Sequence, residues 1–242
     1  MILHRKALAM IELVFAIVIM GLALMSAPML VSQAKIGGLS VVQQEAIAAC
    51  ATEVGMIMTR AWDEADTNES DRPPILIVQE NITALNEVKD ANGIGTGKRI
   101  GIPKSAARSF LTSSGQRLNA SSISNEDVDE YDDIDDFNGK STVLANEGTT
   151  NTEAGDYIDS SLTMTTTVEY ISTSTTDNEY KSTTVNFNAP FSNGASNITT
   201  NVKTISTNII SFAHADVLDT NITLKAFMCN IGTYKPLKIR TF

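Results

Sequence analysis

The sequence predicts an α+β protein in which a long N-terminal helix packs on a C-terminal antiparallel β-sheet. Three observations predict this class. Residues 8–31 are almost entirely apolar, residues 32–66 place apolar side chains at helical spacing, and residues 162–242 are rich in Thr, Ser, Asn and β-branched residues. A helix repeats about every 3.6 residues and a strand every 2, so these patterns predict a helical first part and a strand-rich last part.

Composition narrows the classes of function. The chain has 242 residues, a formal net charge of −10 and an estimated pI of about 4.7. This acidic balance argues against a nucleic-acid partner, because phosphate binding needs clustered Lys and Arg. Two cysteines are too few for a disulfide-rich scaffold or a cysteine zinc site.

The run from Ala7 to Val31 predicts a membrane segment. At about 1.5 Å per residue, a helix of this length exceeds the roughly 30 Å of a bilayer core. It is too long for the apolar region of a secretory signal peptide. Residues 4–6 are His, Arg and Lys. By the positive-inside rule, the N-terminus is then cytoplasmic and the rest of the chain lies outside, as in a signal anchor.

Glu12 is the single charged residue of this run. A carboxylate inside a membrane segment is costly and usually has a partner. The residues alone leave three readings open: a carboxylate that reaches the interface, a protonated side chain, or a charge paired with a partner.

The stretch "RKALAMIELVFAIVIMG" resembles the N-terminus of type IV prepilins and type II secretion pseudopilins. The resemblance implies a leader at residues 1–7, cleavage by a prepilin peptidase between Ala7 and Leu8, and N-methylation of Leu8. Glu12 is then the fifth mature residue, and its implied partner is the Leu8 amine of a neighbouring subunit. Ala7 and Leu8 replace the family's usual glycine and phenylalanine, and Pro28 lies one residue earlier than is common.

The resemblance also implies a location and partners. Residues 8–31 would form the transmembrane and filament-core helix, and residues 67–242 a periplasmic globular domain. The chain would sit once through the bacterial inner membrane, meet the assembly platform there, and then join other pilin or pseudopilin subunits in a filament. Adhesion, motility, secretion and DNA-uptake filaments all remain open.

Residues 32–66 predict an amphipathic continuation of the helix. Apolar side chains recur at steps of three and four, and the polar sequence after residue 66 ends the pattern. Glycine and proline weaken a helix interior by about 1 and 3 kcal/mol respectively. The helix is therefore expected to kink or locally melt at four positions: Gly21, Pro28, Gly37 and Gly38.

The region 162–242 predicts an antiparallel sheet. Four segments, 162–172, 182–189, 201–210 and 221–232, partly alternate apolar and polar residues, and clusters of Asn, Gly and Pro separate them. Short connections between strands favour antiparallel pairing. This arrangement of helix and sheet resembles the pilin fold.

Residues 125–140 form an acidic loop whose charges must be solvated, paired or bound to a cation. Oxygen ligands suit Ca²⁺, although the EF-hand spacing is absent. The alternatives are a calcium site, a solvated loop, and a docking surface for another subunit. Part of the loop also resembles minor pilins of the mannose-sensitive haemagglutinin type. The candidate calcium ligands are Asp129, Asp132, Asp133, Asp135, Asp136 and Asn138.

The two cysteines allow two readings. Cys50 lies on the apolar stripe of the helix and Cys229 in the last predicted strand, so in a pilin fold they could meet. The extracytoplasmic compartment permits a disulfide, whereas the alternative is two thiols that pack as small apolar groups.

The sequence predicts a structural subunit and no enzyme. After removal of the leader His214 is the last histidine, and no GxSxG motif accompanies it. The alternative function is a signal-anchored binding protein or adhesin, which could depend on Ca²⁺ and would never polymerise. Apart from the calcium alternative, no cofactor is expected.

Overall fold

A computed structural model describes the chain at residues 3–67, 73–102, 108–123, 131–145, 161–172, 183, 191, 194–211 and 221–232. The chain forms two compact units, Met1–Ile47 and Ala48–Phe242. The predicted strand at 182–189, apart from residue 183, lies outside the described residues, as do Asp129 and His214.

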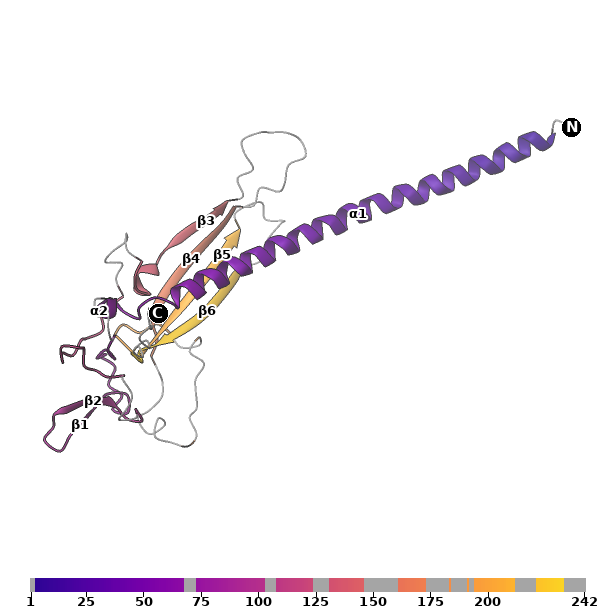
Figure 1. The fold of residues 1–242 in the computed structure, drawn as a ribbon. Coiled ribbons are helices and arrows are strands. Elements are labelled where there is room, and N and C mark those ends of the chain that lie inside the picture. The colour runs from indigo at the N-terminus through magenta and orange to yellow at the C-terminus, as the bar shows by residue number, and fades with distance from the viewer. Residues whose placement is uncertain are drawn as a thin grey trace, which may run out of the picture. The chain divides into compact units, whose positions relative to one another are not determined.

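Helix α1 (Leu3–Ile57) contains every described residue of the first unit and continues into the second (Figure 1). It begins inside the predicted leader and stays helical through Pro28, Gly37 and Gly38. Because proline lacks a backbone N–H, Pro28 removes one hydrogen bond from the ladder. The helix is nevertheless continuous, so melting at these positions stays a prediction.

The amphipathic helix ends earlier than predicted, at Ile57 instead of residue 66. The N–H groups of Thr59 and Arg60 donate three residues back, to Met56 and Ile57, which tightens the last turn. The next N–H, of Ala61, donates to the carbonyl of Asp132 at 3.2 Å. The chain therefore leaves the helix because a distant segment supplies its next backbone partner. The short helix α2 (Glu64–Thr67) follows.

The second unit contains a four-stranded antiparallel sheet, which confirms the predicted α+β class (Figure 1). Its order is β3-β4-β5-β6. Three strands match predicted segments, whereas β3 was not predicted, because it is short and follows the acidic loop directly. The strands are β3 (Ser141–Ala145), β4 (Ser161–Tyr170), β5 (Val202–Ser211) and β6 (Ile222–Cys229).

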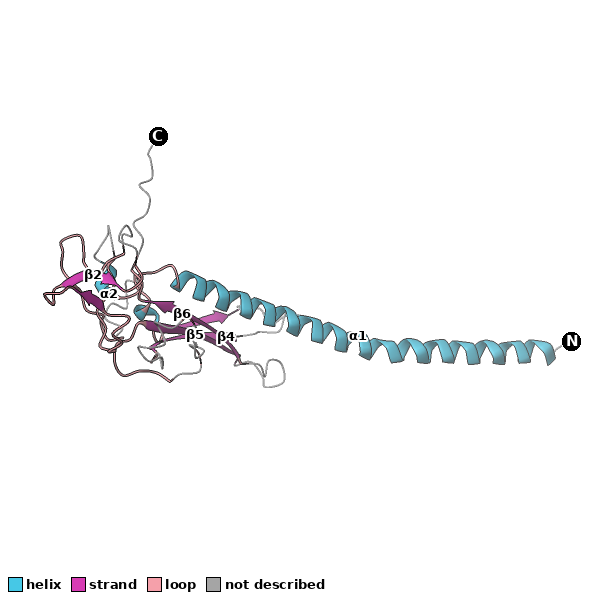
Figure 2. Cartoon of the chain, turned by 90° about the horizontal axis from the view of Figure 1, so that it is seen from below, coloured by secondary structure: helices cyan, strands magenta, loops and turns pink. Residues whose placement is uncertain are grey.

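Two small elements complete the second unit. Strands β1 (Glu87–Lys89) and β2 (Gly95–Arg99) pair antiparallel in a separate two-stranded sheet, which lies apart from β4, β5 and β6 (Figure 2). The acidic loop contains a 3-10 turn, η1 (Asp135–Phe137), which precedes β3. Gly139 follows at φ 80°, a backbone conformation that glycine adopts without steric cost.

The core of the second unit lies between the end of α1 and one face of the sheet. Val54 and Ile57 of α1 pack there with Val168 of β4 and Ile205 of β5. Strand residues alternate between buried and more exposed along β4 and β5, as a sheet with one covered face requires. The remaining buried members of this cluster are Trp62, Leu76, Ile134, Phe137 and Tyr170.

Candidate functional site: the N-terminal helix and a buried lysine

The N-terminal part of α1 presents an apolar surface. Its large apolar side chains between Met10 and Val31 are 52% to 80% exposed. An 18-residue window of this helix has a mean hydropathy of 2.5, and none of it is buried. Removing one such side chain from water, into a membrane or a protein interface, is favourable by about 1.5–3 kcal/mol. By length and composition the helix can therefore cross a membrane.

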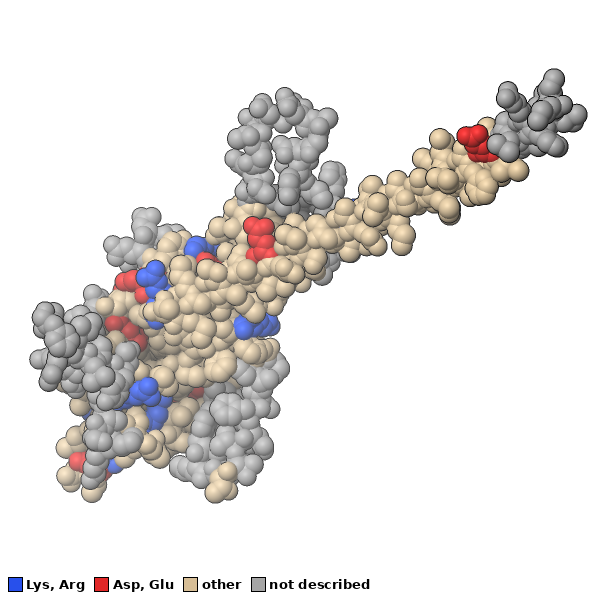
Figure 3. All heavy atoms as spheres, turned by 45° about the vertical axis from the view of Figure 1, so that its right-hand side comes forward, with Lys and Arg blue, Asp and Glu red and all other residues tan. Residues whose placement is uncertain are grey.

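Glu12 is the only charged residue between Met10 and Ala34, and its side chain is exposed on α1. Figure 3 shows the long uncharged surface of this part of the helix. Ala7 and Leu8 lie one turn before Glu12 in the same helix. Residues four apart share a helix face, so the Leu8 backbone and the Glu12 side chain lie on one side of α1.

A second candidate site lies within the globular unit, where a cluster of polar and aromatic groups surrounds Lys203. This residue is the first inward-facing position of β5, and its side chain is fully buried. Its Nζ donates to the Trp62 carbonyl at 2.9 Å, to Asp63 Oδ2 at 3.0 Å and to Asp135 Oδ2 at 2.6 Å. All three ammonium protons therefore have acceptors, and two of these are carboxylates.

Aromatic rings line the same site. The Lys203 Nζ lies 4.3 Å from the ring centroid of Trp62 and 4.8 Å from that of Tyr170. Tyr170 faces Lys203 across the β4–β5 pair, and its ring meets Trp62 edge-on at 6.0 Å. A desolvated cation over an aromatic face gains electrostatic stabilisation. The rings therefore enclose the charge and also interact with it.

Asp63 is held from several sides. Its carboxylate accepts hydrogen bonds from the Ser121 N–H at 3.1 and 3.2 Å, from the Ser121 hydroxyl at 3.1 Å and from the Tyr170 hydroxyl at 3.0 Å. Burial, followed by the charges of Asp63 and Asp135, raises the pKa of Tyr170. Tyr170 therefore acts here as a hydrogen-bond donor.

The acidic loop supplies the other side of the site. Asp133, Asp135 and Asp136 are 1%, 3% and 7% exposed, so these three acids of the loop are buried, whereas Asp132 is exposed. Asp133 accepts from the N–H groups of Asp135 and Asp136 at 2.6 and 3.1 Å. Asp136 accepts from Asp132 and Asp133, and Asn138 from Val168. Asp133 and Asp136 therefore stabilise the conformation of their own loop, whereas Asn138 attaches the loop to β4.

Burial changes the acidity of two of these carboxyl groups. Burial, together with the charge of Asp135, raises the pKa of Asp133 to about 7. Burial also raises the pKa of Asp135 to about 6, although Lys203 opposes that shift. Both groups therefore exchange protons at far higher pH than an exposed aspartate.

The candidate calcium ligands that the structure describes, Asp132, Asp133, Asp135, Asp136 and Asn138, do not gather around an ion site. No group of three or more His, Cys, Asp or Glu is placed to hold a metal in the part of the chain that the structure describes. Asp135 instead faces Lys203, an ammonium group that already supplies positive charge. Asp135 of the acidic loop is thus paired with a basic group, and the described candidate ligands give the calcium alternative no support.

The two cysteines are free thiols, so the structure favours the alternative without a disulfide. Cys50 is buried on α1 and Cys229 is half-buried at the end of β6. Burial raises the pKa of the Cys229 thiol. Trp62 is also buried, and its indole N–H has no hydrogen-bond partner among the described residues.

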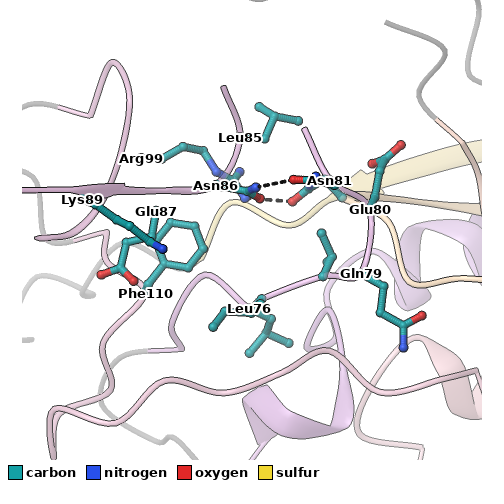
Figure 4. A pocket seen from close by; sticks show the side chains of 13 residues that line it. Leu76, Gln79, Glu80, Asn81, Leu85, Asn86, Glu87, Lys89, Arg99 and Phe110 are labelled. Carbon is teal, nitrogen blue, oxygen red and sulfur yellow. Dashed lines mark hydrogen bonds between the residues drawn. The ribbon is translucent and has the colours of Figure 1, made fainter. Parts of the chain in front are cut away.

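A hollow of about 330 Å³ lies beside β1 and β2 (Figure 4). Its Arg99 donates to Asn201 at 2.8 Å and to the Asn230 carbonyl at 2.9 Å. Its Glu87 pairs with Arg117 at 2.7 Å. Because protein partners already hold these two charged groups, we assign the hollow no ligand.

The sequence reasoning did not identify Asp63, Tyr170 or Lys203 as members of one site. One pattern in the sequence does indicate that Lys203 is buried. The alternation of β5 puts it on the same face as Ile205 and Ile209. A lysine on the covered face of a sheet needs an anionic partner. The acidic loop offered such a partner, but the spacing along the chain does not show which residue it is.

Comparison of the chain with protein-family models, with curated proteins and with solved structures finds no match.

Proposed function

We propose that the chain is a structural subunit of a type IV pilus or type II secretion filament, a minor pilin or pseudopilin. It is inserted in the bacterial inner membrane with its globular unit in the periplasm, cleaved after Ala7, and polymerised through α1. The observation that carries this proposal is the long, exposed apolar helix with a single acid, Glu12, one turn after the cleavage point.

The exposed apolar side chains of α1 support a role for this helix in binding a membrane or other subunits. A contiguous apolar surface of this extent is unfavourable in water and indicates a membrane or protein partner. The bilayer covers it before assembly, and the helices of neighbouring subunits cover it in the filament. No chemistry by the protein is needed for either step.

Glu12 has a defined role in this scheme. Cleavage creates an α-amino group on Leu8, one helical turn from Glu12. In the membrane the carboxylate can neutralise the amine of its own chain, and in the filament it pairs with the amine of a neighbour. A carboxylate inside a membrane segment is costly when it is unpaired, so pairing with a Leu8 amine stabilises Glu12 both in the membrane and in the filament.

N-terminal sequencing of the protein from cell membranes and sheared filaments tests the cleavage. We expect a mature N-terminus at Leu8, with methylation, in cells that have active prepilin peptidase. A chain that keeps Met1 as its only form would overturn the proposal and support a signal-anchored binding protein. Cleavage far downstream of Leu8 would instead indicate a removed signal sequence.

The Glu12→Ala variant tests assembly. We expect it to insert in the membrane and to be lost from filaments, since the Leu8 amine then has no acid to pair with. Glu45→Ala is the matched control, because Glu45 is an exposed acid on the same helix outside the apolar segment. Equal incorporation of both variants would contradict the proposed role of Glu12.

A further inference from the structure

Lys203 and Asp135 are in direct contact inside the globular unit. The Nζ–Oδ2 distance is 2.6 Å, and the two side chains are 0% and 4% exposed. The other oxygen of this carboxyl, Asp135 Oδ1, has no hydrogen-bond partner in the described part of the chain. An amine and a carboxyl group are thus in contact away from solvent, and one carboxyl oxygen has no partner among the described residues.

We propose that Lys203 and Asp135 are joined by an intramolecular amide bond, with Asp63 as the group that moves protons. The bond would link β5 to η1 within the globular unit. The inference does not rest on the proposed function, since it concerns the chemistry of this unit alone.

The two aspartates differ in a way that assigns their roles. Asp63 accepts hydrogen bonds from Ser121 and from the Tyr170 hydroxyl, as well as from Lys203. These donors hold both oxygens of Asp63 in place, and its Oδ2 lies 3.0 Å from the Lys203 Nζ, where it can receive a proton. Asp135 has fewer donors, and burial raises its pKa to about 6, which favours the neutral acid that an amine can attack.

The proposed reaction balances as a condensation. Lys203 transfers one ammonium proton to Asp135 Oδ2, which leaves a neutral amine and a neutral carboxylic acid. The amine nitrogen attacks Asp135 Cγ, and Asp63 takes the second proton from that nitrogen. Asp63 then returns this proton to the departing hydroxyl. A C–N bond forms, the Cγ–Oδ2 bond breaks, one water molecule leaves, and Asp63 ends as it began.

The surroundings favour this step over its reverse. The rings of Trp62 and Tyr170 lie 4.3 and 4.8 Å from the Lys203 Nζ and help to exclude water. Fixed proximity replaces a bimolecular encounter, and well-oriented groups reach effective molarities of about 10⁵ M and above. After the reaction the Trp62 carbonyl remains as an acceptor for the amide N–H, because Lys203 already donates to it at 2.9 Å.

Peptide mapping of the full-length chain, purified in detergent and then denatured and digested with trypsin, tests the bond. An acylated Lys203 resists trypsin, so we expect residues 118–140 joined to residues 182–225, at the summed mass less one water. Recovery of separate peptides 118–140 and 182–203 from natively folded protein would overturn the proposal. A link from Lys203 to the peptide with Asp63 would overturn the assignment of roles.

Two variants complete the test. Lys203→Arg keeps a cation but supplies no amine, so its digest should contain peptide 118–140 unlinked. Asp63→Asn keeps an acceptor oxygen but does not carry the proton, so we expect loss of most of the cross-link, with partial recovery in Asp63→Glu. An unchanged yield in a folded Asp63→Asn variant would exclude Asp63 as the proton carrier.

Discussion

At the scale of single residues, the central feature is the ammonium group of Lys203 in a dry site. Asp63 and Asp135 compensate its charge, while Trp62 and Tyr170 enclose it. Removing one partner of a buried ion pair leaves the other charges without compensation. Such a site is therefore far more sensitive to single substitutions than a pair on the surface.

Replacement of Lys203 by Met tests this sensitivity. We expect the free energy of unfolding to fall by about 3–5 kcal/mol, since Asp63 and Asp135 stay buried without the nitrogen that they contact, whether that nitrogen is an ammonium or an amide. Urea unfolding followed by tryptophan fluorescence measures the change, because Trp62 is the single tryptophan. Lys225→Met on the exposed side of β6 is the control and should shift stability by no more than about 0.5 kcal/mol. Equal effects of the two would contradict the role of Lys203.

Asp133 predicts a pH dependence of stability. Its pKa is about 7 in the folded chain against an ordinary value of 3.8, so the folded state holds the extra proton between these values. Stability contributed by the neutral group is full below pH 4 and is lost as pH rises through 7. Burial is the largest cause of the raised pKa of Asp133, so stability still falls with rising pH whether or not Asp135 is joined to Lys203.

The Asp133→Asn variant measures this contribution. Its amide oxygen can still accept from the N–H groups of Asp135 and Asp136, but the side chain no longer titrates. We expect a smaller loss of melting temperature than in the parent chain between pH 4 and 7.5. If the melting temperatures of the two proteins change equally with pH, Asp133 does not cause the pH dependence.

At the scale of elements, α1 differs along its length. The part from Leu13 to Val31 has almost only apolar side chains, whereas Val54 and Ile57 pack on the sheet. Between them, Gly37 and Gly38 have no atom within 4 Å of an added Cβ. Packing therefore does not require glycine at these positions. The physical effect of the two glycines is instead to lower the stability of the helix there.

Gly37→Ala with Gly38→Ala should stabilise this part of α1 by about 1 kcal/mol per substitution. In the detergent-solubilised chain we expect slower amide hydrogen exchange around residues 35–40. Gly55→Ala is the control, since it lies in α1 with equal space and outside that segment. Unchanged exchange in the double variant would exclude these glycines as the weak point of the helix. If assembly requires melting there, filament incorporation falls as well.

At the scale of the whole molecule, the chain combines an apolar helix with an acidic globular unit. The first unit contains the large exposed apolar side chains from Met10 to Ile36, and the core of the second unit is complete without them. A chain that begins at residue 32 should therefore stay in solution after cell lysis, whereas the full chain should need detergent. Fractionation by ultracentrifugation measures both. Recovery of the full chain in the soluble fraction would contradict a membrane role for the helix.

The sequence by itself determined the local elements of this protein. The apolar run with Glu12, the helical spacing of residues 32–57 and the alternation of β4, β5 and β6 all follow from periodicity, which neighbouring residues set.

Only the tertiary structure decided where α1 ends, that Asp133, Asp135 and Asp136 of the acidic loop are buried, and which groups surround Lys203. Those features depend on contacts across 140 residues to Asp63 and 68 residues to Asp135. Spacing along the chain does not encode such contacts, because they form only when the sheet and the loop pack together.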